Sequence, residues 1–332
     1  NMLTINQVKE LSKSLKINES VVIREYVQLL FLKELYEEKY SENVFFKGGT
    51  AIRLVLGGTR FSEDLDFTVD GNKEDFDLFI KRFFKKPTKL YGFSFKKRKT
   101  ITGERYLLTA DSSVGDYKIF VNLDFSFREK VLMPAKAIIT TNYPVIFTSF
   151  VNYISREEIL AEKVRAIMTR DKGRDIYDLW FLLNINVPVV GELIKEKLAY
   201  YDIKDFNSDQ LVAKIDNFSK EKFVLDLRPF VPMTSSADLN PRFPRPNEDD
   251  ISAFNSSPDS KSGVFLNTVI NEREKLPEVI PVNLNYEIVS YWFKEGKDEL
   301  VKADVKYKLL SPEGKELLTL PFSKPSQDVQ QY

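Results

Sequence analysis

Hydrophobic residues recur at intervals of three and four along several stretches of the chain, a spacing that predicts amphipathic helices. The first long stretch covers residues 18–40, and a second covers residues 73–86. After residue 150 the same spacing dominates and a capping-box pattern precedes it. There we expect helices over residues 156–170, 173–185 and 190–201.

Other stretches alternate apolar and polar positions, which predicts half-buried strands. A short apolar run at residues 44–46 and an alternating run at residues 61–69 flank a Gly-Gly pair. Three further strands are expected, with turns between them, over residues 93–101, 105–111 and 117–127. Near the C-terminus, residues 282–293 and 299–310 alternate as well.

These elements divide the chain into four parts. Residues 1–149 form a mixed α/β block and residues 150–230 a helical domain. Residues 231–263, rich in Pro, Ser, Asn and Asp, are expected to be a linker or irregular segment. Residues 264–332 form a small β-rich module whose role the sequence does not indicate. The fold class is therefore expected to be α+β.

Composition narrows the chemistry. The 332 residues carry a formal net charge of zero, so no global field attracts nucleic acid or membrane. There is no cysteine and no histidine, which excludes disulfides, zinc–thiolate sites, cysteine nucleophiles and histidine bases. Any acid–base or metal chemistry would use carboxylates, lysine, tyrosine or bound water. No apolar run reaches the length of a spanning helix and no signal peptide is apparent, so a cytoplasmic location without a membrane partner is expected.

The segment "FFKGGTAIRLVLGGTRFSEDLDF", residues 45–67, concentrates the candidate chemistry. On a strand, Asp64 and Asp66 would point to the same face and repel each other, and a hard dication such as Mg²⁺ would relieve that repulsion. Gly48 and Gly49 lie between a predicted strand and a predicted helix, where backbone N–H groups can bind phosphate. Alone, Gly-Gly is often a turn and Asp-x-Asp a solvated strand end, but their order together favours phosphoryl or nucleotidyl transfer.

These residues resemble the signature of the AbiEii/AbiGii toxin family of nucleotidyltransferases, within the DNA-polymerase-β-like superfamily. The R-x-S-x-D-x-D pattern of that family is matched by Arg60, Ser62, Asp64 and Asp66. Its later motifs are matched by Lys118 and Asp124 on a strand and by Lys163, Arg165, Arg170, Arg174, Asp175 and Asp178 on helices. The spacer of 14 residues between Gly49 and Asp64 is slightly longer than usual. The resemblance spans roughly residues 10–230 and does not reach the C-terminal module.

The resemblance implies a nucleotidyltransferase-like mixed sheet and an enzyme that uses a nucleoside triphosphate with Mg²⁺ or Mn²⁺. Such proteins resemble toxins of toxin–antitoxin or phage-defence systems, with a cognate antitoxin, and some add nucleotides to the 3′ end of tRNA. Asp64, Asp66 and Asp124 would hold the metal, and Asp124 would also position the attacking hydroxyl. The implied nucleotide-binding residues are Gly48, Gly49, Thr50, Arg60, Ser62, Lys118, Arg165, Arg170 and Arg174. Lys163 would neutralise phosphate charge, and Asp175 would either orient Lys163 or lie near the base.

Some of these residues also have purely structural interpretations, and the whole protein has alternative functions. Arg174 and Asp178 are four residues apart on a predicted helix, as in a surface salt bridge. Asp124 is harder to explain in this way, because an unpaired acid within an apolar strand is costly. The whole protein could be a catalytically silent binding scaffold, or could nucleotidylate a protein or a small molecule instead of tRNA or another RNA.

A basic stretch raises the question of a polyanionic partner. Residues 81–99 contain nine Lys or Arg and no acid, with five aromatic residues interleaved. Cations and aromatic rings together could follow an RNA backbone and stack on bases. Alternatively, the aromatic residues face the core and the lysines form a solvated surface.

Overall fold

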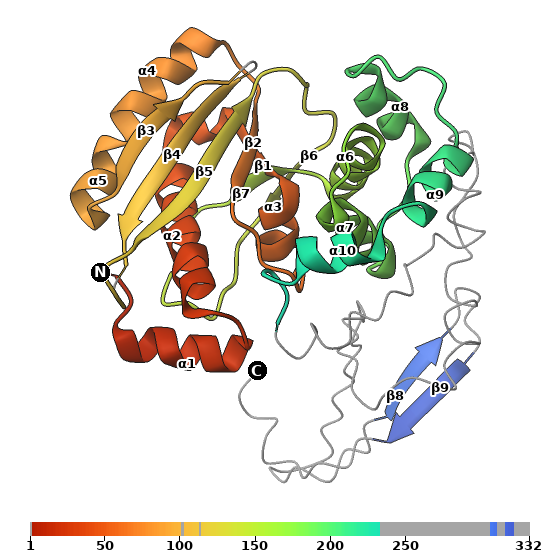
Figure 1. Cartoon of the computed structure of the whole chain (residues 1–332), viewed down its shortest axis with the longest axis horizontal. Coiled ribbons are helices and arrows are strands. Elements are labelled where there is room, and N and C mark those ends of the chain that lie inside the picture. Colours follow the sequence, from red (N-terminus) through yellow and green to blue (C-terminus); the bar gives the residue numbers. More distant parts are fainter. Residues whose placement is uncertain (1, 101–102, 113, 233–305, 311–315, 322–332) are drawn as a thin grey trace, which may run out of the picture. The chain divides into compact units, whose positions relative to one another are not determined.

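The computed structural model describes residues 2–100, 103–112, 114–232, 306–310 and 316–321. The chain separates into two compact units, Asn1–Ser262 and Gly263–Tyr332. Figure 1 shows the first unit as a sheet with helices around it, followed by a group of helices. This arrangement confirms the expected mixed α and β fold.

A mixed sheet of seven strands forms the centre of the first unit. Its strand order is β3-β4-β5-β2-β1-β7-β6. Strand β2 runs parallel to β5 and β1 parallel to β7, while the other neighbours are antiparallel. The strands are β1 (Val44–Lys47), β2 (Leu65–Val69), β3 (Ser94–Arg98), β4 (Glu104–Asp111), β5 (Lys118–Ser126), β6 (Pro134–Ala137) and β7 (Val151–Ile154).

Helices surround the sheet and follow it along the chain. Those between or before the strands are α1 (Ile5–Leu15), α2 (Glu19–Tyr36), α3 (Gly48–Val55), α4 (Lys73–Phe83) and α5 (Lys85–Tyr91). Those after the last strand are α6 (Arg156–Thr169), α7 (Gly173–Asn184), α8 (Gly191–Ala199), α9 (Ser208–Asp216) and α10 (Lys220–Leu227). Among the described helices, none combines the length and the apolarity that crossing a bilayer requires.

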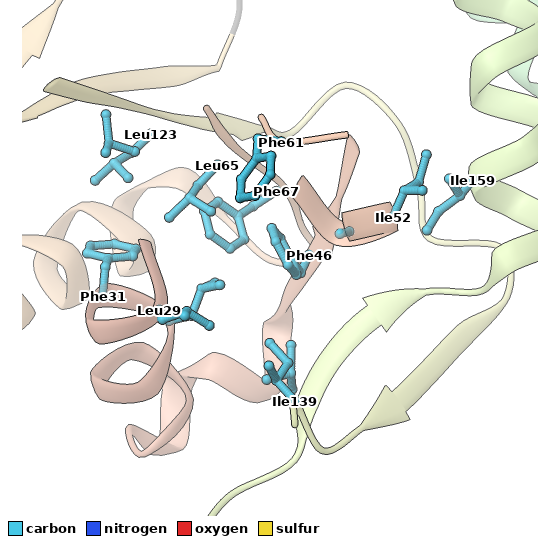
Figure 2. Packing of buried hydrophobic residues seen from close by; sticks show 14 of the residues in the cluster. Leu29, Phe31, Phe46, Ile52, Phe61, Leu65, Phe67, Leu123, Ile139 and Ile159 are labelled. Atoms are coloured by element: carbon cyan, nitrogen blue, oxygen red, sulfur yellow. The ribbon is translucent and has the colours of Figure 1, made fainter. Parts of the chain in front are cut away.

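The hydrophobic core lies on one face of the sheet, against α2 and α4. Alternate positions of the central strands supply it, and Phe67 of β2 stacks on Phe125 of β5 with ring centroids 4.9 Å apart. Phe31 of α2 and Phe76 of α4 complete the layer at 6.5 Å from Phe67 and 4.8 Å from Phe125. Figure 2 shows Phe31, Phe46 and Phe67 within this packing. The opposite positions of the same strands are therefore free to carry polar chemistry.

The structure differs from the expected elements around residue 60. Strand β2 begins at Leu65 rather than at residue 61. The reason is that the backbone N–H of Phe61 donates to the carbonyl of Phe230, 2.7 Å away, and not to a neighbouring strand. Helix α2 ends at Tyr36, and a 3₁₀ turn (Lys39–Asn43) leads into β1.

Strand β7 extends the sheet beyond the boundary expected at residue 149, because Val151–Ile154 pairs with β1 and β6. The helical part then begins at Ser155, whose hydroxyl accepts from the backbone N–H of Glu158 as expected. The Glu158 side chain does not complete the capping box. It accepts instead from the backbone N–H groups of Leu132 and Met133.

In the second unit, β8 (Lys306–Leu310) and β9 (Glu316–Pro321) form an antiparallel pair. This matches the C-terminal end of the strand expected over residues 299–310. The strand expected over residues 282–293 lies outside the described residues, as does the segment from residue 233 to residue 263.

Candidate active site

Five strands bring charged residues into one line across the sheet. Asp66 of β2 lies opposite Asp124 of β5, and Asp124 lies opposite Arg105 of β4. The line continues to Lys47 of β1 beyond Asp66 and to Arg98 of β3 beyond Arg105. Because directly opposite residues share a sheet face, all five side chains lie on the face away from the hydrophobic core. Two carboxylates thus stand between cations at the centre of the sheet.

Asp64 joins these two carboxylates from the residue before β2. Its Oδ1 accepts a hydrogen bond of 2.9 Å from the Asn122 side chain on β5. Its backbone carbonyl accepts from the hydroxyl of Thr50 in α3. Thr50 therefore fixes the position of Asp64.

The three carboxylates repel one another. Burial raises the pKa of Asp66 to about 6, and the negative charges of Asp64 and Asp124 add to the shift against the opposing effect of Lys47 and Lys163. Burial also raises the pKa of Asp124, although Arg105, which forms an ion pair with it, acts in the opposite direction. Such a site gains from a bound cation, and its oxygen donors are those that Mg²⁺ and Mn²⁺ prefer. Within the described residues, no group of three or more acidic side chains already lies close enough together to hold a metal ion, so Asp64, Asp66 and Asp124 would have to move together to bind one.

The two glycines are held in close contact with this site. Gly48 begins α3 with φ at +78°, and a Cβ there would overlap the Asp66 carboxylate. A Cβ on Gly49 would overlap the guanidinium of Arg60 and lie 3.1 Å from the hydroxyl of Ser62. Only glycine satisfies both constraints at Gly48, since other residues rarely adopt a positive φ.

A buried ionic network lies beside the carboxylates. Arg60 donates from Nε and Nη2 to the two oxygens of Asp178, at 2.5 and 2.6 Å. Lys163 Nζ lies 2.7 Å from Asp178 and 3.1 Å from Asp175. Arg170 donates to both oxygens of Asp175, at 2.7 and 2.9 Å. Asp175 and Asp178 therefore orient the cations in this network.

The charges in this network support each other. Burial alone would lower the pKa of Lys163, but Asp178 and Asp175 outweigh it and raise the pKa above its usual range. Burial likewise opposes ionisation of Asp175, yet Lys163 and Arg170 hold its pKa below the usual range. Lys163 remains a cation next to the carboxylates, and it is close enough to Asp66 to lower the pKa of that group.

A second buried ionic group ties the start of α3 to the helices. Lys197 of α8, with no exposed surface, contacts Glu158 at 2.6 Å and Glu162 at 3.2 Å. Lys47, directly before Gly48, contacts Glu162 at 2.9 Å. This group was not predicted. Two of its acids lie on α6 with helical spacing, and a third, Glu129, lies 3.3 Å from Lys197 and 3.9 Å from Lys47, but the sequence does not show which cations meet them.

Three of the expected site residues contact groups other than the carboxylates. Lys118 is exposed at the other end of β5 and contacts Asp111 at 2.8 Å. Arg165 lies over the Tyr201 ring, with its guanidinium carbon 4.5 Å from the ring centre. Arg174 contacts Glu63 at 3.5 Å, so the surface salt bridge considered between Arg174 and Asp178 is not formed.

The sequence interpretation missed three residues that the structure places at the carboxylates. They are Lys47, Arg105 and Asn122. Asn122 could have been found from strand alternation, because it lies two residues before Asp124. The other two depend on strand order and register, which one sequence does not give.

A nucleotidyltransferase fold with a Gly-Gly turn and three carboxylates on one sheet face defines the class of protein. The family model described as "Nucleotidyl transferase AbiEii toxin, Type IV TA system" matches residues 30–248. The chain therefore belongs to the AbiEii family and is a toxin-like nucleotidyltransferase. No curated protein matches the chain by sequence.

One solved structure, MenT4, supports this fold. MenT4, a nucleotidyltransferase toxin from Mycobacterium tuberculosis H37Rv, is 17% identical with a TM-score of 0.50, covering 76% of this chain and 88% of that one. JHP933 from Helicobacter pylori is 24% identical with a TM-score of 0.39, covering 63% and 79% of the two chains. A nucleotidyltransferase from H. pylori is 21% identical with a TM-score of 0.41, covering 72% and 92%.

Proposed function

We propose that this enzyme transfers a nucleotide from a nucleoside triphosphate to the 3′ end of a tRNA, using Mg²⁺ or Mn²⁺ held by Asp64, Asp66 and Asp124. The observation that carries the proposal is the pairing of Asp66 with Asp124, which brings two carboxylates together beside a third. Burial, together with the charges of Asp64 and Asp124, raises the pKa of Asp66, and a strongly shifted carboxyl of this kind is typical of a functional site. A bound dication would supply a compensating positive charge and polarise the transferred phosphoryl group.

The residues around the carboxylates suit a triphosphate. The N-terminus of α3 begins at Gly48, where free backbone N–H groups favour an anion. Lys163 adds a buried positive charge whose direction Asp175 and Asp178 fix. Arg170 is exposed and adds another, held by Asp175. In this proposal Asp175 is a positioning residue and does not touch the base.

The acceptor hydroxyl would approach Asp124 from β4 and β5, since Asp124 lies on the side of the site away from the α3 glycines. Asp124 is half-buried and reachable from solvent, and its pKa is raised by burial. It can therefore orient the hydroxyl and accept its proton as the bond to phosphorus forms. A silent scaffold would have no use for three mutually repelling carboxylates.

The experiment incubates the full chain with Mg²⁺, each radiolabelled triphosphate in turn, and total tRNA. Transfer of label to tRNA is expected, with a loss of at least about 100-fold in Asp64→Ala. Lys118→Ala is the matched control and should retain full activity, because its side chain lies at the far end of β5. Label on the protein or on a small molecule would identify a different acceptor. Absence of transfer to any acceptor would contradict the proposal.

The family description also supports a biological setting. A type IV toxin acts alongside a cognate antitoxin, and we include such a partner in the proposal. Because tRNA and nucleoside triphosphates are cytoplasmic, the enzyme would act there, as a growth-arresting toxin or in phage defence. Co-expression with a neighbouring gene product that restores growth would test this part.

A further inference from the structure

The face of β3, β4 and β5 that carries Asp124 is open along its whole length in the described part of the chain. We call this surface the open face. It consists of three rows of opposite residues, which are Ser94–Thr109–Phe120, Lys96–Leu107–Asn122 and Arg98–Arg105–Asp124. Each of these residues is exposed or half-buried. The third row ends at the carboxylates, so the open face leads directly into the candidate active site.

The other face of the same strands is closed. There Tyr106, Leu108, Val121 and Phe125 are buried in the core. Phe120, by contrast, exposes 49% of its surface on the open face. An exposed aromatic ring on a strand surface that also carries cations can stack on a planar group of a bound partner.

The open face is positively charged away from the carboxylates. Lys96 and Arg98 are exposed, and in the described part of the chain no carboxylate lies within ion-pair distance of either. The uncompensated charge on the open face is therefore that of Lys96 and Arg98.

We propose that the open face binds the single-stranded 3′ end of the acceptor nucleic acid. Lys96 and Arg98 bind backbone phosphates, and Phe120 stacks on a base. This inference rests on the proposed function, and it assigns a surface to the acceptor. Phe120 and Asp124 are four residues apart, about 13 Å along a strand. That is the rise of about four stacked nucleotides, so the terminal hydroxyl reaches Asp124 when the stacked base lies about four positions upstream.

A second basic surface provides the matched control. A groove of about 380 Å³ on the closed side is lined by Lys81, Lys85 and Lys89 above Phe84 and Phe95. Those two rings already stack on each other, with centroids 3.9 Å apart and planes at 4°. The groove has three lysines, one more than the open face has cations without an acidic partner, but it does not lead to the carboxylates.

Binding is measured by fluorescence anisotropy with a labelled RNA hairpin that ends in a four-nucleotide 3′ overhang. The full chain carries Asp64→Ala and no triphosphate is added, so the result does not depend on transfer. The double variant Lys96→Ala with Arg98→Ala should bind about tenfold more weakly and lower the slope of log K against log salt by about 1.4. Lys85→Ala with Lys89→Ala removes the same charge and should bind like the parent.

Phe120→Ala should weaken binding of the overhang hairpin by about tenfold and leave binding of a blunt hairpin unchanged. Phe150→Ala, which removes an aromatic ring that is 61% exposed elsewhere, is its control. Thermal unfolding should be unchanged in all of these surface variants.

Three results would overturn the inference. The first is equal RNA affinity of the Asp64→Ala parent and the Lys96/Arg98 variant. If the wild-type enzyme nevertheless labels tRNA, the proposed function still stands. The second is an equal loss in the Lys85/Lys89 control. The third is a pair of results, in which poly-L-glutamate displaces the RNA and Phe120→Ala leaves the RNA affinity unchanged. That pair would assign the surface to an acidic protein. The two proposals can also be separated in the other direction. If the Lys96/Arg98 variant loses RNA affinity but the wild-type enzyme labels only protein, the proposed function is contradicted and the RNA-binding surface is supported.

Discussion

Asp66 of β2 lies directly opposite Asp124 of β5 in a parallel pairing, with the nearest cations on the strands to either side. In a parallel pair the two side chains project from the same face at neighbouring positions. Asp124 is turned toward Arg105 and Asp66 packs against Gly48, but both acids remain on the same face of the sheet. The electrostatic behaviour of this pair should therefore dominate how the protein responds to pH and to divalent metals.

Metal binding should weaken below pH 6. The pKa of Asp66 is raised to about 6, and a protonated carboxyl is a poor ligand. The affinity for Mn²⁺ should fall by up to about tenfold per pH unit below that value. Isothermal titration calorimetry from pH 8 to pH 5 measures this, and the dependence should be weaker in Asp66→Asn, which keeps only the contributions of the other carboxylates. An affinity that is constant over this range would contradict the assignment of Asp66.

The metal-free protein should respond to pH in the opposite sense. The folded-state pKa of Asp66 is raised, so its contribution to stability is present below about pH 4 and is lost as the pH rises through 6. In EDTA at pH 7.5, Asp66→Asn should be more stable than the parent by on the order of 1 to 2 kcal/mol. Urea unfolding at pH 7.5 and pH 5 measures the difference, which should shrink at the lower pH.

Gly48→Ala should disable the site, while Gly57→Ala should only strain the backbone. Both glycines have a positive φ, but a Cβ at Gly57 meets no atom within 4 Å and one at Gly48 overlaps Asp66. Gly57→Ala should cost about 1 kcal/mol of stability and leave metal affinity unchanged. Gly48→Ala should cost more and weaken Mn²⁺ binding. Equal metal affinity in the two variants would show that Gly48 is not packed against the Asp66 carboxylate.

The Arg60–Asp178 pair should be among the more important single contributions to stability. It is bidentate, and the two side chains are only 5% and 1% exposed. Arg60→Met leaves Asp178 with one cation fewer in a buried site, so a loss of about 3 kcal/mol is expected. The exposed pair of Lys118 and Asp111 is the control, since Lys118→Met should change stability by less than about 0.5 kcal/mol. Denaturant midpoints compare them.

Arg105 should compete with the metal for Asp124. Its guanidinium forms an ion pair with Asp124, and that ion pair must break for Asp124 to bind a cation. Because the pair is partly exposed, its loss in Arg105→Ala should tighten Mn²⁺ binding by about two- to fivefold at pH 8. Calorimetry at that pH compares the Mn²⁺ affinities of the two proteins. Weaker binding in the variant would mean that Arg105 helps to hold the metal site together.

The local parts of the fold and site could be predicted from sequence, because each is specified by neighbouring residues. Gly48 and Gly49 between a strand and a helix, and Asp64 and Asp66 in alternation, need no knowledge of distant segments. Lys118 shows where such reasoning fails. It lies six residues from Asp124, about 20 Å along the strand, so a shared strand did not mean a shared site.

The remaining site residues depend on contacts between distant segments. Arg105 reaches Asp124 only through the register of β4 and β5, and Asp178 meets Arg60 across 118 residues of chain. Both acids and also Arg60 were identified from the sequence, but neither pairing was predicted and Arg105 was not identified. Helical spacing suggested Arg174 for Asp178, but tertiary packing placed a different arginine there.

The buried group around Lys197 has a consequence for how the chain folds. Lys47 ends β1, and its counter-charge, Glu162, belongs to α6. A fragment that stopped before α6 would leave Lys47 without that partner, directly beside the turn that holds Gly48. The separated helical segment would lose the same contact between Lys47 and Glu162, and of these two lysines only Lys197 would remain beside Glu162. The sheet and the helices should therefore unfold in a single cooperative transition, and complementation between separately expressed halves should require that they fold together.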